Sequence, residues 1–453
     1  MCRSAPSWGK TQPLQLQIEK LVYGGDGLAR LPADDKGPGK TVFVPFVVSG
    51  EKVEATLAET RPGFARARLI QILTPSAERV QPDCPYFQSC GGCQYQHIAY
   101  EAQLRYKAEI LRETLRRTAK LELQNEISIH AGEPWHYRNR TRMHVEHAPK
   151  FQLGYHRHGS RQLLPVEQCP VSSPLINQAV RGVWALRSDG KLPQSVHGIQ
   201  FFANHDDQQL LIELYVRPGG TAKECQPFAA ELHQLLPAVA GLVVFVSSPV
   251  EDESRQFAPL SSIHPDPGQA IGANSLRYRV ADHEFRVSAG SFFQTNRFLV
   301  GELLKAAIPQ QTGRAALDLY AGVGLFASSL SQNFDQVLAV EVSPLSFADL
   351  RHNASPNVKP IRATTEAFLS ERGTKLAPDL IVVDPPRAGL GEKTARALGR
   401  MSVPRVTYVS CDPATLARDL RLLLESGFRV EQVHLVDLFP QTAHMETVLH
   451  LMR

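Results

Sequence analysis

The sequence has little that would place the protein in a membrane or outside the cell. Its 453 residues contain no run of about 18 uncharged apolar residues. The first residues do not read as a charged segment followed by an apolar stretch and a small-residue cleavage site. Its 7 cysteines are odd in number and do not resemble the disulfide framework of a secreted domain. We therefore expect a cytoplasmic protein with no membrane partner.

A strong overall charge is also missing. A net charge of +4 and a pI near 8.6 neither demand nor exclude nucleic acid as a partner. Locally, however, residues 135–161 hold six Lys or Arg and five His against one acid, Glu146, with four aromatic residues interleaved. This composition fits a phosphate-contacting surface with stacking side chains, and it fits a solvated, strand-rich face equally well. The irregular spacing of the histidines argues against a metal site there.

The first part of the chain predicts a small β-barrel. The chain is long enough for two to four domains, and its 43% apolar and 21% charged residues are ordinary for a globular protein. Between residues 12 and 74, short alternating runs are separated by Gly-, Asp- and Pro-rich turns. The expected strands cover residues 14–22, 41–48, 51–60 and 65–73. This pattern favours a Greek-key barrel of the oligonucleotide-binding (OB) type.

The middle of the chain, residues 75–275, predicts an α+β domain. A cysteine-rich loop at 82–97 precedes an amphipathic helix at 100–120. Strand patterns then run from 127 to about 246, interrupted by helices near 173–187 and 225–236. Residues 247–269 contain four prolines, which predict a surface loop.

The last part, residues 276–453, predicts an α/β domain. From Leu317 onward, apolar strands alternate with helical patterns, which is typical of a doubly wound parallel sheet with helices on both faces. The expected strands cover residues 316–320, 336–342, 380–384, 406–410 and 429–439.

A glycine-rich turn follows the first of these strands. Asp-Leu-Tyr-Ala-Gly-Val-Gly at 318–324 would bring backbone amides close to a ligand, and Ala327 stands where the dinucleotide fingerprint has its third glycine. Taken alone, the motif does not separate a dinucleotide from another adenosine cofactor. Glu341 ends the next strand, 19 residues after Gly322, where a carboxylate can bind both ribose hydroxyls. The whole arrangement suits S-adenosylmethionine better than a dinucleotide.

Two further residues, Asp384 and Cys411, fall where open α/β sheets bind ligands, at the ends of strands. Asp384 precedes Pro-Pro-Arg, whose prolines stiffen the loop and whose Arg387 could reach a phosphate or an oxyanion. Cys411 ends the next strand, and the helix expected at 415–424 could supply the N-terminus that lowers a thiol pKa. Glu446 starts the last strand. A lone Cys is more often a core residue and a lone Glu a surface residue. A catalytic role for Cys411 and Glu446 is therefore indicated only by their occurrence together with Asp384.

With these motifs the chain resembles the RNA 5-methyluridine methyltransferase family, and more closely its bacterial 23S ribosomal RNA members, over nearly its whole length. The resemblance implies an N-terminal TRAM barrel, a central RNA-binding domain with an iron-sulfur site, and a Rossmann-like methyltransferase domain. It also implies roles for individual residues: Cys411 as nucleophile, Glu446 as general base, Gln294, Tyr320, Gly322, Glu341 and Asp384 as S-adenosylmethionine contacts, and Cys84, Cys90, Cys93 and Cys169 as ligands of a [4Fe-4S] cluster. The chain departs from many members at Asp412, where they have Asn, and at Ala321, where they have Cys.

The chemistry of uracil explains why the family needs these groups. Carbon 5 of uracil is a poor nucleophile, so a thiolate adds to carbon 6 and creates an enolate that can accept a methyl group. A base then removes the proton from carbon 5, and elimination frees the cysteine. The target base must leave its stack to enter the site.

Several alternatives remain open at this point. The spacing C-x5-C-x2-C plus a distant Cys-Pro also suits zinc by ligand type, although the resemblance favours the cluster. A radical S-adenosylmethionine enzyme would use three closely spaced ligands, whereas here a fourth cysteine closes the site. Other possible functions are a non-catalytic RNA-binding or ribosome-assembly protein and an RNA cytosine C5 methyltransferase. Transfer RNA is a less favoured substrate, because the transfer-RNA enzymes of this family lack the barrel and the cluster. We expect a monomer.

Overall fold

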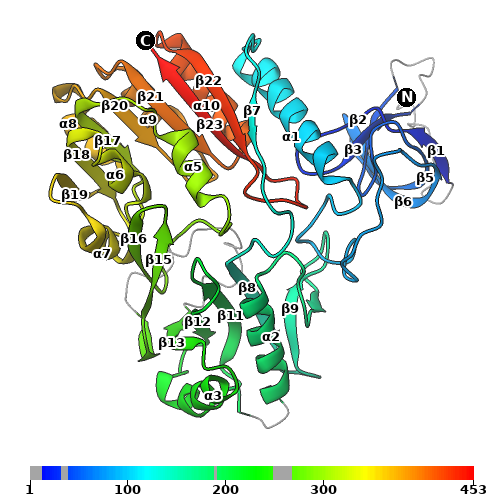
Figure 1. Ribbon diagram of the computed structural model, residues 1–453. Coiled ribbons are helices and arrows are strands. Elements are labelled where there is room, and N and C mark those ends of the chain that lie inside the picture. The colour runs from blue at the N-terminus through cyan, green and yellow to red at the C-terminus, as the bar shows by residue number, and fades with distance from the viewer. Residues whose placement is uncertain (1–12, 32–38, 188–190, 248–267) are drawn as a thin grey trace, which may run out of the picture. The chain divides into compact units, whose positions relative to one another are not determined.

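A computed structural model describes residues 13–31, 39–187, 191–247 and 268–453 (Figure 1). By its internal contacts the chain divides into two compact units. The first unit contains residues 1–110 and 439–444, and the second contains residues 111–438 and 445–453. Within the described ranges, the structure has no helix that is both long and apolar enough to cross a membrane.

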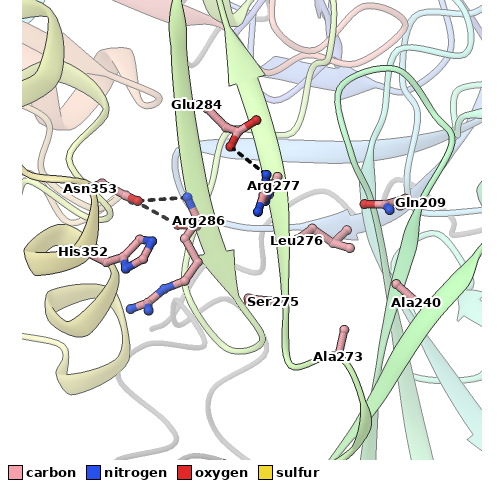
Figure 2. Close-up of a pocket in the computed structure, with 10 residues that line it drawn as sticks. All are labelled: Gln209, Ala240, Ala273, Ser275, Leu276, Arg277, Glu284, Arg286, His352 and Asn353. Carbon is pink, nitrogen blue, oxygen red and sulfur yellow. Dashed lines mark hydrogen bonds and ion pairs between the residues drawn. The ribbon is translucent and has the colours of Figure 1, made fainter.

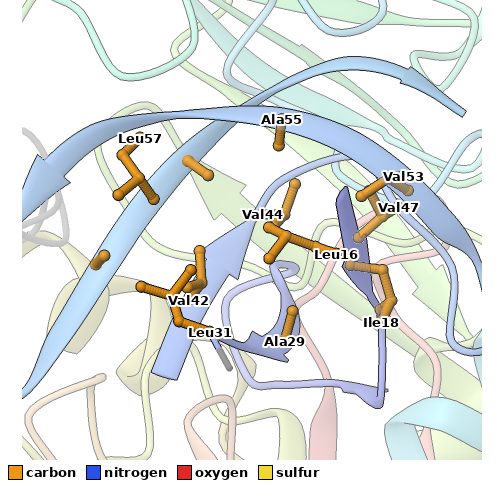
Figure 3. Close-up of a cluster of buried hydrophobic side chains, with 12 residues drawn as sticks. Leu16, Ile18, Ala29, Leu31, Val42, Val44, Val47, Val53, Ala55 and Leu57 are labelled. Carbon is orange, nitrogen blue, oxygen red and sulfur yellow. The ribbon is translucent and has the colours of Figure 1, made fainter. Parts of the chain in front are cut away.

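The first unit contains a strongly curved, six-stranded sheet of order β1-β5-β6-β4-β3-β2. Its strands are β1 (Leu14–Gln17), β2 (Lys20–Leu21), β3 (Gly27–Arg30), β4 (Thr41–Val44), β5 (Lys52–Thr60) and β6 (Phe64–Thr74). Alternate side chains of β5, including Val53, Ala55 and Leu57, point into a core made of Leu, Ile, Val and Ala (Figure 3). The four expected strand regions are confirmed.

Besides the sheet, the first unit contains the cysteine-rich loop and the first part of a helix that continues into the second unit. The loop begins and ends near a bridge between Arg79 and Ile98, and it leads into α1 (Tyr100–Thr114), which continues to residue 119 as the π-helical turn η1 (Leu115–Ala119). The expected helix at 100–120 is therefore confirmed. Residues 439–444 belong to this unit because the Gln94 and Tyr95 amides donate to the Gln441 carbonyl.

The second unit contains a central seven-stranded sheet of order β10-β9-β8-β11-β12-β13-β14. Its strands are β8 (Arg140–Glu146), β9 (Gln152–His156), β10 (Leu163–Pro165), β11 (Val196–Ala203), β12 (Leu210–Val216), β13 (Val239–Val246) and β14 (Gln269–Gly272). Helices α2 (Pro174–Leu186) and α3 (Ala222–Leu235) pack on this sheet and on each other, as the helical patterns predict. Most of the proline-rich loop expected at 247–269 lies outside the described residues.

A two-stranded hairpin follows the central sheet and was not predicted. It pairs β15 (Ser275–Val280) with β16 (His283–Ser288). The strands are joined by Ala281 and Asp282, and Ala281 has a positive φ of 48°. Asp282 is the only turn-forming residue type between the two strands, so the turn gives only a weak signal in the sequence.

The C-terminal sheet has eight strands in the order β19-β18-β17-β20-β21-β23-β22-β7. They are β7 (Ser128–His130), β17 (Gly313–Leu319), β18 (Phe334–Glu341), β19 (Val358–Arg362), β20 (Leu380–Val383), β21 (Arg405–Ser410), β22 (Arg429–Val436) and β23 (Glu446–Met452). All five expected strands are present. The expectation of a parallel sheet holds for these five strands, but the whole sheet is mixed, because β23 inserts between β21 and β22 and runs antiparallel to both (Figure 1).

Helices cover both faces of this sheet (Figure 1). They are α5 (Val300–Ala307), α6 (Leu325–Leu330), α7 (Pro344–Asn353), α8 (Thr365–Arg372), α9 (Gly391–Gly399) and α10 (Pro413–Glu425). Helix α5 packs on α6, whereas α9 packs on both α8 and α10, so the helices form two separate layers. The alternation of strands and helices from β17 to β22 is the doubly wound arrangement expected from the sequence.

Candidate functional site at the carboxyl edge of the C-terminal sheet

Five of the predicted site residues gather at one edge of the C-terminal sheet. Strands β17, β18, β20 and β21 are parallel, so the loops after them lie at the same edge. These loops carry Tyr320, Glu341, Asp384 and Cys411. Glu446 reaches the same edge from the start of antiparallel β23, because the neighbouring Thr447 pairs with Ser410.

The glycine-rich turn after β17 has an unusual backbone conformation. Tyr320, Gly322 and Gly324 have positive φ angles of 65°, 56° and 98°. A positive φ is costly for a tyrosine, and such strain is concentrated at functional sites. A Cβ placed on Gly322 would meet no heavy atom within 4 Å, so the turn faces open space at this point.

Glu341 supports this turn directly. Its carboxylate accepts hydrogen bonds from the amides of Gly322 at 2.9 Å and Ser343 at 2.6 Å. Burial raises the pKa of Glu341, and the bonds from Ser343 and Gly322 oppose that shift. Each carboxylate oxygen can accept two hydrogen bonds and accepts one amide here, so the group can still accept one hydrogen bond from each of two ribose hydroxyls.

Apolar side chains beside the predicted cofactor contacts are unusually exposed. Val342, directly after Glu341, is 52% exposed, and Phe292, two residues before Gln294, is 47% exposed. Gln294 itself is buried. Flat ligands such as nucleobases pack on apolar and aromatic side chains of this kind. Val342 was missed by sequence reasoning, because a single valine after a strand carries no distinct signal.

Two carboxyl groups near this turn have raised pKa values: Asp318 is buried, and Asp384 is partly buried. Burial, with the nearby charge of Asp384, raises the pKa of Asp318 to about 8, although the Ala327 amide opposes the shift. Burial raises the pKa of Asp384 to about 7. Both side chains therefore bind a proton much more tightly than an exposed aspartate does.

Glu446 and Asp384 interact closely. Glu446 is buried at the start of β23, and both burial and the charge of Asp384 raise its pKa well above the usual range. The Arg387 guanidinium acts in the opposite direction. Two such carboxyl groups at close range titrate as a pair, and the first ionisation makes the second more difficult.

Cys411 stands next to the same groups. Burial and the charges of Glu446 and Asp384 raise the pKa of its thiol, and Arg387 opposes them. The amides at the start of α10 are taken, because the Asp412 side chain accepts from Ala414 and Thr415 at 3.0 and 2.9 Å. The cation that favours a thiolate here is therefore Arg387, and the helix N-terminus that the sequence suggested is capped by a carboxylate.

The four cysteines predicted as cluster ligands are divided between the two units. Cys84, Cys90 and Cys93 belong to the first unit and Cys169 to the second, and all four are partly buried. Among the described residues, no group of three or more His, Cys, Asp or Glu side chains has an arrangement that could hold a metal ion. The iron-sulfur site stays a prediction.

The basic segment 135–161 is partly structural. Arg140 lies 4.2 Å from the ring centroid of Phe202, and Arg142 lies 3.9 Å from that of Tyr215. Lys150 and Arg161, in contrast, are exposed. Some of the cations counted in the sequence thus stabilise the central sheet, and others are available to a phosphate backbone.

A cavity of about 760 Å³ lies elsewhere in the second unit (Figure 2). Residues of the β15–β16 hairpin, including Arg277 and Arg286, line one side, and His352 and Asn353 of α7 line another. The residues drawn in Figure 2 include none of the predicted catalytic or cofactor-binding residues. Its charged side chains Arg277 and Glu284 lie 3.5 Å apart and pair with each other.

The sequence of the chain is similar to those of known RNA methyltransferases. Residues 9–70 match the TRAM domain family, and residues 272–453 match the tRNA (Uracil-5-)-methyltransferase family. An uncharacterized RNA methyltransferase of Aquifex aeolicus is 31% identical over 97% of this chain and 98% of its own. The 23S rRNA (uracil(1939)-C(5))-methyltransferase RlmD of Shewanella frigidimarina is 31% identical over 96% of this chain and 95% of its own.

A solved structure shares the fold. The tRNA (uracil-54, C5)-methyltransferase of Pyrococcus abyssi, in complex with S-adenosyl-L-homocysteine, has a TM-score of 0.74 at 21% identity. The match covers 96% of this chain and 99% of that one. The resemblance read from the sequence motifs is thereby confirmed. The chain belongs to the family of S-adenosylmethionine-dependent RNA uracil-C5 methyltransferases.

Proposed function

We propose that the protein methylates carbon 5 of a uridine in 23S ribosomal RNA through a covalent bond between Cys411 and the base. The observation that carries this proposal is that strand pairing brings Asp384, Cys411 and Glu446 to one edge of the sheet. The name of the Shewanella relative supports ribosomal RNA as the substrate. The TRAM match supports RNA as the class of partner.

The cofactor would lie across the turn at residues 320–324. Glu341 would bind the ribose hydroxyls, and Val342 would pack against the adenine ring. Gln294, Tyr320, Gly322 and Asp384 would complete the contacts, and the open space in front of Gly322 fits a ligand at close range. S-adenosylmethionine, when bound, supplies the methyl group to the substrate.

The reaction begins with the sulfur of Cys411. The thiol first releases its proton to water. The thiolate then forms a bond to carbon 6 of uracil, and the electrons of the C5–C6 double bond move toward the C4 carbonyl oxygen as an enolate. Those electrons would return through carbon 5 to form its bond to the methyl group, while the bond between that methyl group and the sulfonium sulfur breaks and S-adenosylhomocysteine is left. Glu446 then takes the proton from carbon 5, the C5–C6 double bond forms again, and the C6–S bond breaks to release the thiolate.

The raised pKa values suit this sequence of proton transfers. A buried thiol stays protonated before the substrate arrives, which protects it from unwanted reactions with other electrophiles. Glu446 must be ionised to act as a base, and a pKa above the usual carboxyl range brings its strength closer to that needed near neutral pH. Arg387 favours the ionised forms of both groups.

Contacts to the RNA would come from more than one region. The barrel of the first unit and the exposed cations of segment 135–161, such as Lys150 and Arg161, would contact phosphates. Phe292, exposed beside Gln294, would stack on the extruded uracil or on its neighbour. These contacts would select a single-stranded or opened region of the RNA.

The [4Fe-4S] cluster belongs to this proposal as well. Four thiolates from Cys84, Cys90, Cys93 and Cys169 are a soft donor set that suits either the cluster or zinc. Anaerobic purification followed by iron, sulfide and zinc analysis distinguishes the two. Iron and sulfide at about four per chain, lost in Cys90→Ser, would support the cluster, and one zinc per chain would contradict it.

A methyl-transfer assay tests the proposed substrate. Radiolabelled S-adenosylmethionine is incubated with transcripts of 23S ribosomal RNA or of transfer RNA, and digested nucleosides are identified by mass spectrometry. The proposal expects 5-methyluridine from 23S ribosomal RNA. If 5-methyluridine formed only from transfer RNA, the proposed substrate would be wrong. If the product were 5-methylcytidine, the proposed reaction would be wrong. RNA binding with no methylated product would favour a non-catalytic assembly protein.

A further inference from the structure

We infer that Asp349 and Asn353, on helix α7, are positioning residues that hold the segment bearing Gln294 at a fixed distance from the glycine-rich turn. The inference rests on the proposed cofactor site. It concerns two side chains that would not touch the cofactor. Instead they would set the spacing between the two backbone segments that do.

Asp349 holds the segment that leads to Gln294. Its carboxylate is buried and accepts four hydrogen bonds from residues 286–291. The donors are the Arg286 Nε at 2.7 Å, the Ser288 amide at 2.8 Å, and the hydroxyls of Ser288 and Ser291, both at 2.7 Å. Ser291 is only three residues before Gln294. The carboxylate therefore fixes the start of the loop from which Gln294 projects.

Asn353 holds the other segment. It lies four residues after Asp349 and therefore on the same side of α7. Its Nδ2 donates to the carbonyls of Val323 at 2.9 Å and Arg286 at 3.0 Å, and its Oδ1 accepts from the Arg286 amide at 2.9 Å. Figure 2 shows Asn353 facing Arg286 across this contact. Val323 is the central residue of the turn between Gly322 and Gly324, so one amide side chain joins both segments.

The same helix is tied to the acidic contact of the cofactor site. Helix α7 begins directly after Ser343, whose side chain caps it and whose amide donates to Glu341. One rigid helix thus connects Glu341, the glycine-rich turn and the Gln294 segment. A ligand held by all three needs their spacing correct to well under 1 Å.

A second set of bonds holds the Gln294 segment from the opposite side. The Gly290 amide donates to the buried carboxylate of Glu213 on β12, and Arg140 Nη1 donates to the Ser291 carbonyl. Without Asp349 the segment would keep these bonds to the central sheet. We therefore expect that loss of Asp349 shifts the segment away from α7 and leaves the fold intact.

The test uses the full-length protein carrying Asp349→Asn. The substitution keeps the size of the side chain but turns an NH2 group toward one N–H donor, either Arg286 Nε or the Ser288 amide, so that this bond fails and the hydroxyl on the same side must reverse its bond. Binding of S-adenosylhomocysteine is measured by titration calorimetry and RNA binding by filter retention. We expect the affinity for S-adenosylhomocysteine to fall, and the KM for S-adenosylmethionine to rise, by about tenfold or more. The affinity for RNA should change by less than about twofold.

Asp379→Asn is the matched control. Asp379 also accepts backbone hydrogen bonds, from the amides of Arg314 at 2.7 Å and Ala315 at 3.0 Å, but at the beginning of β17 and so at the other edge of the sheet. The Asp379→Asn variant should have a lower thermal stability than the wild type and the same affinity for S-adenosylhomocysteine. Ser291→Ala, which removes one donor to Asp349, gives a smaller loss in the same direction and serves if Asp349→Asn does not fold.

The outcomes separate this inference from the proposed function. If the wild-type protein binds the analogue and both Asp349→Asn and Ser291→Ala bind it equally well, the positioning role is wrong and the cofactor site stands. If Asp379→Asn weakens binding as much as Asp349→Asn does, the effect is general destabilisation and the inference also fails. If the wild type itself does not bind the analogue, the proposed cofactor site fails and this inference fails with it.

Discussion

Buried carboxylates in the two units have opposite environments. In the first unit, Glu51 accepts bonds from Arg79 through both oxygens, at 2.6 and 2.8 Å, and from the Val48 and Ser76 amides. Burial alone would raise the pKa of Glu51, but these partners outweigh burial and the pKa is lowered. In the second unit, burial raises the pKa of Asp384, and burial together with neighbouring charge raises the pKa of Glu446 and Asp318.

The difference separates a structural acid from candidate catalytic acids. Glu51 is ionised and fully matched by donors, so its charge stabilises the fold. The acids at the sheet edge gather with few cations near them, which costs stability and leaves proton-binding groups close to Cys411. Perturbed pKa values of this second kind are concentrated at functional sites. Each of the following predictions tests one side of this contrast.

The largest effect is expected for Glu446→Gln. Glutamine fills the same space but cannot take the proton from carbon 5, so we expect methyl transfer to fall about 10²–10⁴-fold. Because addition and methylation precede this step, the covalent adduct with unmodified RNA should accumulate. Denaturing gels of the variant with RNA and S-adenosylmethionine provide the measurement. A variant that turns over at the wild-type rate would remove Glu446 from the mechanism.

Glu51→Gln should lower the stability of the fold and leave catalysis unchanged, which is the opposite of what we expect for Glu446→Gln. The Glu51→Gln substitution leaves the charge of the partly buried Arg79 unmatched and should lower the free energy of unfolding by about 3 kcal/mol. The rate constant of methyl transfer for folded protein should not change. Glu51 has a lowered pKa, so its contribution is present above the unfolded pKa and is lost as pH falls through the folded one. Urea unfolding at several pH values measures this, and a stability equal to that of the wild type would contradict it.

Asp318→Asn should change the pH dependence of stability. With the folded pKa raised to about 8, the native state holds a proton on Asp318 that the unfolded chain loses above about pH 4. Stability of the wild type therefore falls as pH rises from about 4 to 8. The variant lacks this loss and should gain up to a few kcal/mol relative to the wild type between pH 5 and pH 8. If the free energies of unfolding of the variant and the wild type differed by the same amount at pH 5 and at pH 8, Asp318 would not have the raised pKa described above.

The smallest effect is expected at Asp412. The charge of Asp412 is among those that raise the pKa of the Cys411 thiol. Asparagine caps a helix as well as aspartate does, so Asp412→Asn removes the charge and keeps α10. The rise of methyl transfer with pH should move to lower pH and increase the rate at pH 6 a few-fold. Asp412→Ala, which also loses the cap, should instead cost about 1 kcal/mol of stability.

Much of the site was readable from the sequence because its residues follow apolar strands. Asp384, Cys411 and Glu341 each stand at the end of such a run, and the carboxyl ends of parallel strands meet at one edge. The direction of β23 was not readable, since a strand pattern is the same in both directions. Strand β7 has three residues and β19 contains Pro360, so neither gives a clear pattern.

The supporting contacts could not be predicted for a different reason. Asp349 and Asn353 are polar residues on a helix, a position that usually indicates the solvent face. Their partners at 286–291 are about 60 residues away, and only the fold brings them together. Arg140 and Arg142 likewise counted as surface cations in the sequence, whereas their guanidinium groups stack on Phe202 and Tyr215.

Covalent trapping with 5-fluorouridine tests the central claim most directly. Anaerobically purified protein is incubated with S-adenosylmethionine and 23S ribosomal RNA containing 5-fluorouridine, and the products are separated on a denaturing gel. Since a base cannot remove fluorine from carbon 5, the bond between Cys411 and carbon 6 should persist. We predict a shifted band that is absent in Cys411→Ala and kept in Cys225→Ala, whose cysteine is buried in α3. A band that persists in Cys411→Ala, or no band while the RNA stays bound, would contradict the account.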